Sequence, residues 1–226
     1  MNAQAYRWDF GIVWEYRTLL VDATWLTLGM AAASIALGVA FGLLLALLRL
    51  SPLRALAWPV MLAIELLRAV PPLVFVVWIY YCLPILVGLS FSAIQTSIIA
   101  LALYAGAFYA EIFRAGIQSV QKGHLEAAYA VGMTRPRALL RITIPLAFQN
   151  VLPPFISQCI LVLKNTSLAS FIAVPEILYQ GQRISIQTFR PLEILTAIAV
   201  VFICIIIPLT LLANLAEARI RRRYYA

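Results

Sequence analysis

The sequence predicts an all-α integral membrane protein with five transmembrane helices. Of its 226 residues, 64% are hydrophobic and only 12% are charged, and its mean hydropathy is +0.95. These values are typical of membrane proteins rather than soluble domains. The apolar residues also gather in runs of about 20, the length that a helix needs to cross a hydrocarbon core about 30 Å thick.

Five such runs follow one another along the chain. They cover 19–48, 58–82, 92–113, 148–172 and 194–215. The first run has Asp22 near its start and lacks a basic leader and a small-residue cleavage site, so we interpret it as a retained span. We therefore divide the chain into an N-terminal extracytoplasmic segment (1–18), a transmembrane domain (19–217) and a basic cytoplasmic tail (218–226).

The basic residues stand at the ends of the runs, and their distribution predicts an orientation. Most of them fall after runs one, three and five: Arg49, Arg54, Arg114, Lys122, Arg135, Arg137, Arg141, Arg219, Arg221, Arg222 and Arg223. By the positive-inside rule this side is cytoplasmic, with the amino terminus outside and the carboxyl terminus inside. The same rule explains the net charge of +8 without a nucleic-acid partner.

Enzyme and metal chemistry find little support in the residues. Cys82, Cys159 and Cys204 all lie in apolar runs, and His124 is the only histidine. This predicts buried free thiols rather than a disulfide framework or a metal site. An intramembrane enzyme would need a nucleophile with a base, or paired acids, and the apolar runs offer neither.

Run one carries Ser34, Gly38 and Gly42 at four-residue spacing. Small residues on one stripe let a second helix approach closely, so we predict a helix-packing surface. In run two, Glu65 and Arg68 share one helical face, and Pro71 and Pro72 should bend the helix just beyond them. A charge pair beside a bend usually faces protein or water.

Run four is the least apolar. Asn150, Ser157 and Lys164 recur every seven residues and so share one face, with Gln158 beside it. A lysine at membrane depth is costly unless it faces a partner or a wet cavity. We interpret this face as lining a translocation path, whereas the alternative is a Lys164 that snorkels or binds carbonyl groups at the outer interface. The other residues that we expect along the path are Glu65, Arg68, Asn165, Thr166 and Ser167. Run five contains Pro208 but is otherwise featureless and is assigned to packing.

The loop between runs three and four predicts a helix, a turn and a second helix. His124 to Val131 has a helical composition, Gly132 suits a left-handed turn, and Thr134 can cap a helix through Leu140. Glu126 is expected in the first turn of the first helix, where a carboxylate complements the helix dipole. The small side chains of Ala127, Ala128 and Ala130 leave a smooth surface for another protein.

The spacing in this loop resembles the EAA loop of permease subunits of ABC importers, whose pattern is EAA-x3-G-x9-I-x-L-P. Here the motif runs from Glu126 to Pro145, with Ile144 in place of leucine. ELLRAVPPLV from Glu65, ALYAGAFYAEIFRAGIQSVQKGHLEAAYAVGMT from Ala102 and LVLKNTSLAS from Leu161 resemble the polar amino acid uptake permeases. The likeness covers most of residues 19–217.

The resemblance implies a type I ABC importer permease in a bacterial inner membrane. Its expected partners are two ATPase subunits, a second permease subunit, a periplasmic solute-binding protein, the amino acid substrate and membrane lipid. The loop, about 115–147, would be the coupling region, with contacts at Gly123, Glu126, Ala127, Ala128 and Gly132. The chain has no G-x-x-x-x-G-K-[ST] phosphate loop, so ATP and Mg²⁺ are expected on the ATPase and no cofactor on this chain.

The substrate is predicted from one departure from the family's sequence pattern and from the charges along the path. The family pattern KDTSL reads Lys164, Asn165, Thr166, Ser167 and Leu168 here, so a carboxylate that would suit a cationic ligand is missing. With Lys164 and Arg68 opposed only by Glu65, we expect glutamate, aspartate or their amides, although every amino acid carries a carboxylate. A basic amino acid (Arg, Lys or His) is the alternative substrate. A channel or ion-driven secondary transporter is the competing class, against which the absence of an internal repeat argues.

Overall fold

The computed structural model describes residues 6–225. All secondary structure elements among these residues are helices. Residues 1–5 of the predicted N-terminal segment and Ala226 of the predicted tail lie outside the described residues. The α-helices are α1 Gly11–Glu15, α2 Arg17–Arg49, α3 Arg54–Ala69, α4 Pro72–Tyr81, α5 Leu83–Val87, α6 Ala93–Gln118, α7 Lys122–Ala130, α8 Arg135–Ala138, α9 Ile144–Asn165, α10 Ile177–Thr188 and α11 Pro191–Tyr225. A π-helix, η1 (Leu139–Thr143), precedes α9, and a 3₁₀-helix, η2 (Thr166–Ile172), follows it.

Within the described residues, four helical segments are long and apolar enough to cross a membrane. They are Arg17–Arg49, Ala93–Gln118, Arg135–Ile172 and Pro191–Leu215. The bent pair α3 and α4 makes a fifth span if it is counted as one. The prediction of an all-helical membrane protein is therefore confirmed, with four to five candidate spans.

Run two is broken rather than bent. The axes of α3 and α4 meet at 102°, much more than the bend that Pro71 and Pro72 predicted. Val70 and Pro71 are both extended, with ψ of 132° and 136°, because the helical region is disfavoured for a residue that precedes proline. Pro72 then opens α4, where its missing N–H costs nothing.

The small-residue stripe of α2 packs against α6, as its spacing predicted. A Cβ atom on Gly38 would lie 3.1 Å from the carbonyl oxygen of Ala102. Ser34 lies beside the same helix and donates a hydrogen bond to the carbonyl of Ile98 at 3.4 Å. The absence of side chains along this stripe is what allows the two backbones to approach so closely.

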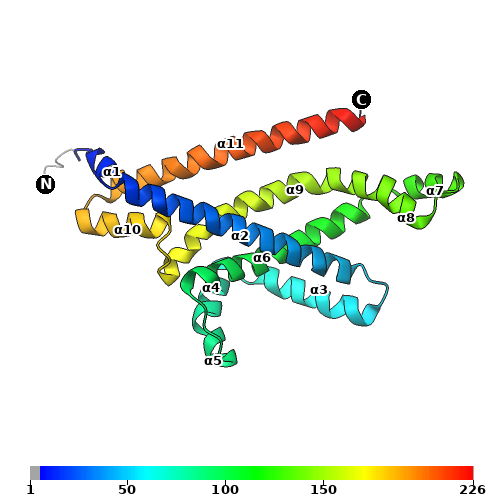
Figure 1. Cartoon of the computed structure of the whole chain (residues 1–226), viewed down its shortest axis with the longest axis horizontal. Coiled ribbons are helices and arrows are strands. Elements are labelled where there is room, and N and C mark those ends of the chain that lie inside the picture. Colours follow the sequence, from blue (N-terminus) through cyan, green and yellow to red (C-terminus); the bar gives the residue numbers. More distant parts are fainter. Residues whose placement is uncertain (1–5, 226) are drawn as a thin grey trace.

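The long helices run along one axis, so the molecule has two distinct ends (Figure 1). At one end, α1 contacts the start of α11, and α10 lies at the same end; at the other, α7 and α8 project beyond the bundle (Figure 1). The end that carries α10 is held by a hydrogen bond from the Ile177 N–H to the Thr27 hydroxyl, at 3.2 Å. An apolar cluster of Leu20, Ile184 and Ile194 surrounds this contact.

Candidate functional site

The loop at the α7 end forms the predicted helix–turn–helix unit, with shifted boundaries. The first helix is Lys122–Ala130 and not His124–Val131. Gly132 has φ of +79°, so the left-handed turn is confirmed. The N–H of Met133 donates to the carbonyl of Ala128 at 3.0 Å, the type of bond that closes a helix end after such a glycine.

The position predicted for Glu126 was wrong. Because α7 begins at Lys122, Glu126 is the fifth helical residue and the first turn holds no acidic side chain. A carboxylate there gains little from the helix dipole, which acts within the first turn. The solvent-exposed face of α7 carries Gly123, Glu126 and Ala127. Ala128, in contrast, is only 3% exposed and packs against the rest of the chain.

The second helix was also predicted incompletely. Thr134 adopts the capping conformation, but its side chain makes no cap hydrogen bond. The helix does not end at Leu140, because the π turn of η1 carries it directly into α9. A wider turn there relieves the clash between the ring of Pro145 and the carbonyl four residues earlier. The result is one continuous 38-residue segment, Arg135–Ile172.

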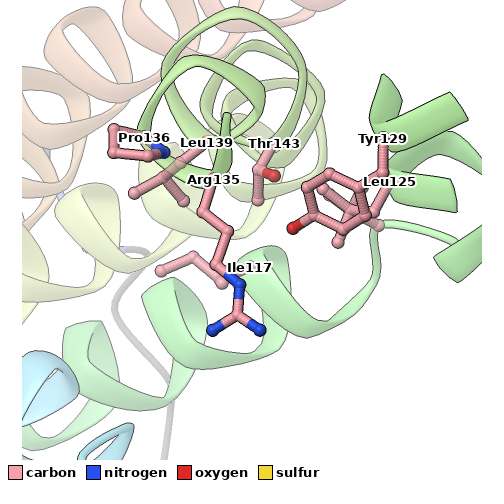
Figure 2. Close-up of a pocket in the computed structure, with 8 residues that line it drawn as sticks. Ile117, Leu125, Tyr129, Arg135, Pro136, Leu139 and Thr143 are labelled. Carbon is pink, nitrogen blue, oxygen red and sulfur yellow. The ribbon is translucent and has the colours of Figure 1, made fainter. Parts of the chain in front are cut away.

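A cavity of about 520 Å³ lies between α7, the end of α6, α8 and η1. Figure 2 shows Tyr129 and Leu125 of α7 on one side and Arg135, Pro136 and Leu139 on the other. The remaining lining residues are Ile117, Val120 and Thr143. The space separates α7 from the end of α6, so α7 is held mainly through its connection to α8 and η1.

The polar residues of α9 lie on one face, as their spacing predicted. Asn150, Ser157 and Lys164 are all exposed in the single chain. The Asn150 amide donates to the Ser119 hydroxyl at 2.7 Å. Gln158, in contrast, is 7% exposed, and its amide nitrogen has no hydrogen-bond partner among the described residues.

The residues after Lys164 divide between two environments. Asn165 and Ser167 are half-buried, and Ser167 donates to the carbonyl of Lys164 at 2.8 Å. Thr166 is fully buried and donates to the carbonyl of Leu163 at 2.7 Å. The Thr166 hydroxyl is therefore used inside the fold, whereas Lys164 and Asn165 retain access to the surface.

Glu65 and Arg68 form the predicted pair, with Arg68 Nη1 3.4 Å from Glu65 Oε1. The Arg68 guanidinium also lies 5.2 Å from the centre of the Phe108 ring, a cation–π distance. Its Nε atom is buried without a hydrogen-bond partner among the described residues. Phe108 was not identified from the sequence, because only the fold brings α3 and α6 together.

A second charged cluster was missed altogether. The Glu111 carboxylate of α6 forms ion pairs with Arg49 at the end of α2 and with Arg114 one turn later. Arg114 Nε donates to the same carboxylate at 3.2 Å. Glu111 also lines a cavity of about 310 Å³ between α6 and α9, together with Ile112, Ala115, Gly116, Ser119, Asn150 and Pro154.

A helical membrane chain with a polar stripe on one span and a helical unit projecting from one end has the architecture of a transport subunit. Comparison with known proteins identifies which kind. The family described as "Binding-protein-dependent transport system inner membrane component" matches residues 38–224. The chain belongs to this family and is a permease subunit of a polar amino acid ABC importer. It is a multi-pass inner membrane transport component and is not itself catalytic.

Relatives support this assignment over nearly the whole chain. The probable glutamine ABC transporter permease protein GlnM of Bacillus subtilis (strain 168) is 31% identical over 96% of this chain and 100% of its own length. The glutamine transport system permease protein GlnP of Escherichia coli (strain K12) is 32% identical over 95% of this chain and 99% of its own. The L-cystine transport system permease protein TcyB of Bacillus subtilis (strain 168) is 32% identical over 96% of this chain and 93% of its own.

A solved structure agrees with the fold. The crystal structure of an amino acid ABC transporter with histidines has a TM-score of 0.88 and 31% identity, covering 95% of this chain and 100% of that chain. Membership in a binding-protein-dependent ABC family implies ATPase and binding-protein partners, with ATP bound by the ATPase.

Proposed function

We propose that this chain forms half of the translocation path of an ATP-driven importer for glutamate, aspartate or their amides. A second permease subunit, identical or closely related, supplies the other half. The observation that carries the proposal is the exposed polar stripe of Asn150, Ser157 and Lys164 along a span of the single chain. Such a stripe is unfavourable against lipid, so it calls for a partner subunit and a wet cavity.

The path residues extend from this stripe to its surroundings. Glu65, Arg68, Asn165 and Ser167 are at least partly accessible and are the further groups that we assign to the path. The Arg68 guanidinium is held over Phe108, and its side chain is 31% exposed, so it is suited to the α-carboxylate that all amino acids share. Thr166, although part of the same motif, contributes by fixing the backbone after Lys164.

The α7–Gly132–α8 unit is proposed to dock on the ATPase. Its exposed face offers Gly123, Glu126 and Ala127, a flat surface around one charge. Ala128 supports the helix from beneath, and Gly132 fixes the angle at which the chain turns into α8. Nucleotide-driven movement of the ATPase would reach α9 directly, because Arg135–Ile172 is one continuous helical segment.

The proposed orientation places α7 and the carboxyl terminus in the cytoplasm and the amino terminus outside. The distribution of basic residues supports it. Because α10 and α7 lie at opposite ends of the molecule (Figure 1), they would face opposite sides of the membrane. In this orientation residues 1–18 are extracytoplasmic, 19–217 form the transmembrane domain and 218–226 form the cytoplasmic tail. We use "outer" for the α10 end and "inner" for the α7 end.

The substrate class rests on Asn165 and on the local charges. An asparagine replaces the aspartate that would pair with a cationic side chain. Among the residues that we assign to the path, Lys164 and Arg68 are positive and only Glu65 is negative. Relatives named for glutamine transport agree with an amide substrate. Basic amino acids remain the alternative.

The substrate is tested by competition in proteoliposomes that hold the complete complex. Uptake of labelled glutamine or glutamate is measured against unlabelled amino acids of each charge class. Competition by acidic amino acids and amides alone supports the assignment. Competition by arginine or lysine, without uptake of glutamine or glutamate, would show that the charges of the path select a cationic substrate.

A further inference from the structure

The connection between α10 and α11 carries an unusually exposed aromatic residue. Phe189 is 86% exposed, and Ile186, one turn earlier, is 73% exposed. Phe189 ends α10 in the left-handed conformation, with φ of 55°, a position that glycine normally takes. A bulky residue with positive φ is strained. In this conformation the apolar side chain of Phe189 lies on the surface rather than in the core.

The surroundings of Phe189 are polar. The exposed stripe of α10 holds Gln182, Arg183 and Gln187 beside Ile186, and we call these four residues together with Phe189 the α10 surface. The opposite stripe of the helix is buried against α2 and α11. Arginine and amide side chains around an exposed ring disfavour burial in lipid acyl chains and are typical of the rim of a protein-binding site.

The α10 surface also has a fixed geometry. Arg190, directly after Phe189, donates to the carbonyl of Arg7 at 2.9 Å and to Glu193 at 3.2 Å. These bonds join the turn to the segment before α1 and to the first turn of α11. Phe189 is thus presented by an anchored turn, which keeps the ordering cost of binding low.

The position in the fold indicates which partner approaches. The carboxyl end of α10 lies at the end of the molecule opposite α7 and α8 (Figure 1), which is the outer end in the proposed function on which this inference rests. The family depends on a binding protein, and this protein delivers its ligand to the outer side. Exposed Arg183 adds positive charge near Phe189, whereas the charge of Arg190 is paired with Glu193. An exposed arginine beside the ring suits a partner whose surface is acidic there.

We propose that the α10 surface is a docking site for the solute-binding protein. In this site Phe189 inserts into an apolar pocket of that protein, and Arg183 meets an acidic rim. The energy of such interfaces is concentrated in a few buried aromatic and arginine side chains. Loss of the Phe189 side chain should therefore remove a large part of the docking free energy.

The test uses the complete complex in proteoliposomes and measures ATP hydrolysis against the concentration of ligand-loaded binding protein. Phe189→Gly removes the ring and also relieves the left-handed strain, so misfolding is not expected. We expect its half-saturating concentration to rise by about tenfold or more, with hydrolysis in the absence of binding protein unchanged. Phe189→Asn, which also tolerates this conformation, should behave in the same way.

Ala173→Gly is the matched control. Ala173 is the other described non-glycine residue with positive φ, at 59°, so this change relieves the same strain without removing an aromatic ring. It should leave the half-saturating concentration unchanged. A Phe189→Gly value within twofold of the wild type would overturn the proposal. Absence of stimulation by binding protein in the wild-type complex would instead contradict the proposed function itself.

Photocrosslinking identifies the partner directly. Phe189→p-benzoylphenylalanine keeps the aromatic shape, and irradiation should join position 189 to the binding protein. Adducts to lipid alone, or to a second copy of this chain alone, would overturn the proposal.

Discussion

Gly42 of α2 and Gly106 of α6 lie in direct backbone contact. A Cβ atom on Gly42 would lie 2.7 Å from the carbonyl oxygen of Gly106 and 2.7 Å from the Cβ atom of Tyr109. No real side chain fits at these distances, so this crossing requires glycine. The pair fixes α2 against the helix that carries Glu111 and Phe108, both of which belong to the candidate site.

Gly42→Val should therefore destabilise the chain. The valine methyl groups would force α2 and α6 apart, at a cost of about 1–3 kcal/mol, typical of overpacking. The measurement is the Tm of the purified subunit in detergent. Gly29→Val is the control, because Gly29 is on the same helix with nothing within 4 Å of its added Cβ. Equal Tm values for the two variants would contradict the packing role of Gly42.

Gly132→Val should weaken association with the ATPase without preventing membrane insertion. No atom lies within 4 Å of an added Cβ, but φ is +79°, so the effect comes from the backbone. A left-handed residue with a side chain costs about 1–2 kcal/mol, which is enough to change the angle between α7 and α8. Co-purification of the ATPase and ATP turnover are the measurements.

Gly88→Val is the matched control for Gly132→Val. It is equally strained, with φ of +71° and open space around it, but it lies between α5 and α6, far from the α7 unit. It should leave ATPase association intact. Normal co-purification and coupled ATP turnover in Gly132→Val would remove Gly132 from the docking site.

Lys164→Ala should abolish or strongly reduce uptake while the complex still assembles. A hydrogen bond to a charged group contributes about 1.5–3 kcal/mol, so the apparent affinity should fall by roughly tenfold or more. Lys164→Arg, which keeps the charge, should retain part of the uptake, whereas Lys164→Gln should not. If transport kinetics are unchanged in Lys164→Ala, the residue does not belong to the path.

Glu111→Gln should lower stability more than Glu65→Gln does. Glu111 sits between two arginines in a largely shielded position, with 25% of its side chain exposed, so its loss leaves Arg49 and Arg114 without compensation. We expect a cost of about 1–3 kcal/mol. Glu65 is 55% exposed, and its single pair should contribute about 0–1 kcal/mol. Thermal unfolding of both variants in the same detergent decides whether this order holds.

Glu176 should make stability depend on pH. Its carboxylate accepts N–H groups of Leu178 and Tyr179 at the start of α10, at 2.9 and 2.7 Å. Burial nevertheless raises its pKa from 4.5 to about 7. The folded state then holds a proton that the unfolded chain releases. This contribution to stability is therefore complete below pH 4.5 and is lost as pH rises to about 7.

Glu176→Gln tests the pH dependence. The amide cannot ionise and keeps an oxygen for the helix cap, so the stability lost by the wild type, on the order of 3 kcal/mol, should be absent in the variant. Tm is measured for both proteins at pH 5 and pH 8. The same pH dependence in both would show that Glu176 is not its source.

The spans and the α7 loop follow from local patterns, which is why the sequence predicts them. Apolar runs mark the spans, small residues mark the stripe of Gly38, and Gly132 marks a turn that other residues adopt only with strain. Pro71 and Pro72 mark where α3 ends. The angle of 102° was not predictable, because it depends on how α4 packs against α6 and η2.

The missed residues depend on tertiary structure. Arg49 and Glu111 are 62 positions apart, and their contact requires knowing that α2 and α6 pack side by side. Phe108 lies within an apolar run and gives no signal until Arg68 is placed above it. Phe189 stands where glycine would be expected, so its left-handed conformation contradicts the local preference. The position of Glu126 in α7 was predicted wrongly because the start of the helix has no sequence signal: Gln121, at the N-cap position, makes no side-chain cap hydrogen bond.

The most direct test of the account is uptake by the reconstituted complex of this chain, its ATPase, any second permease and its binding protein. Labelled glutamine or glutamate is supplied with binding protein, with and without ATP. We predict uptake that requires both ATP and binding protein and is lost when α7 can no longer dock. Uptake that proceeds without ATP and follows an ion gradient would contradict the account and identify a secondary transporter.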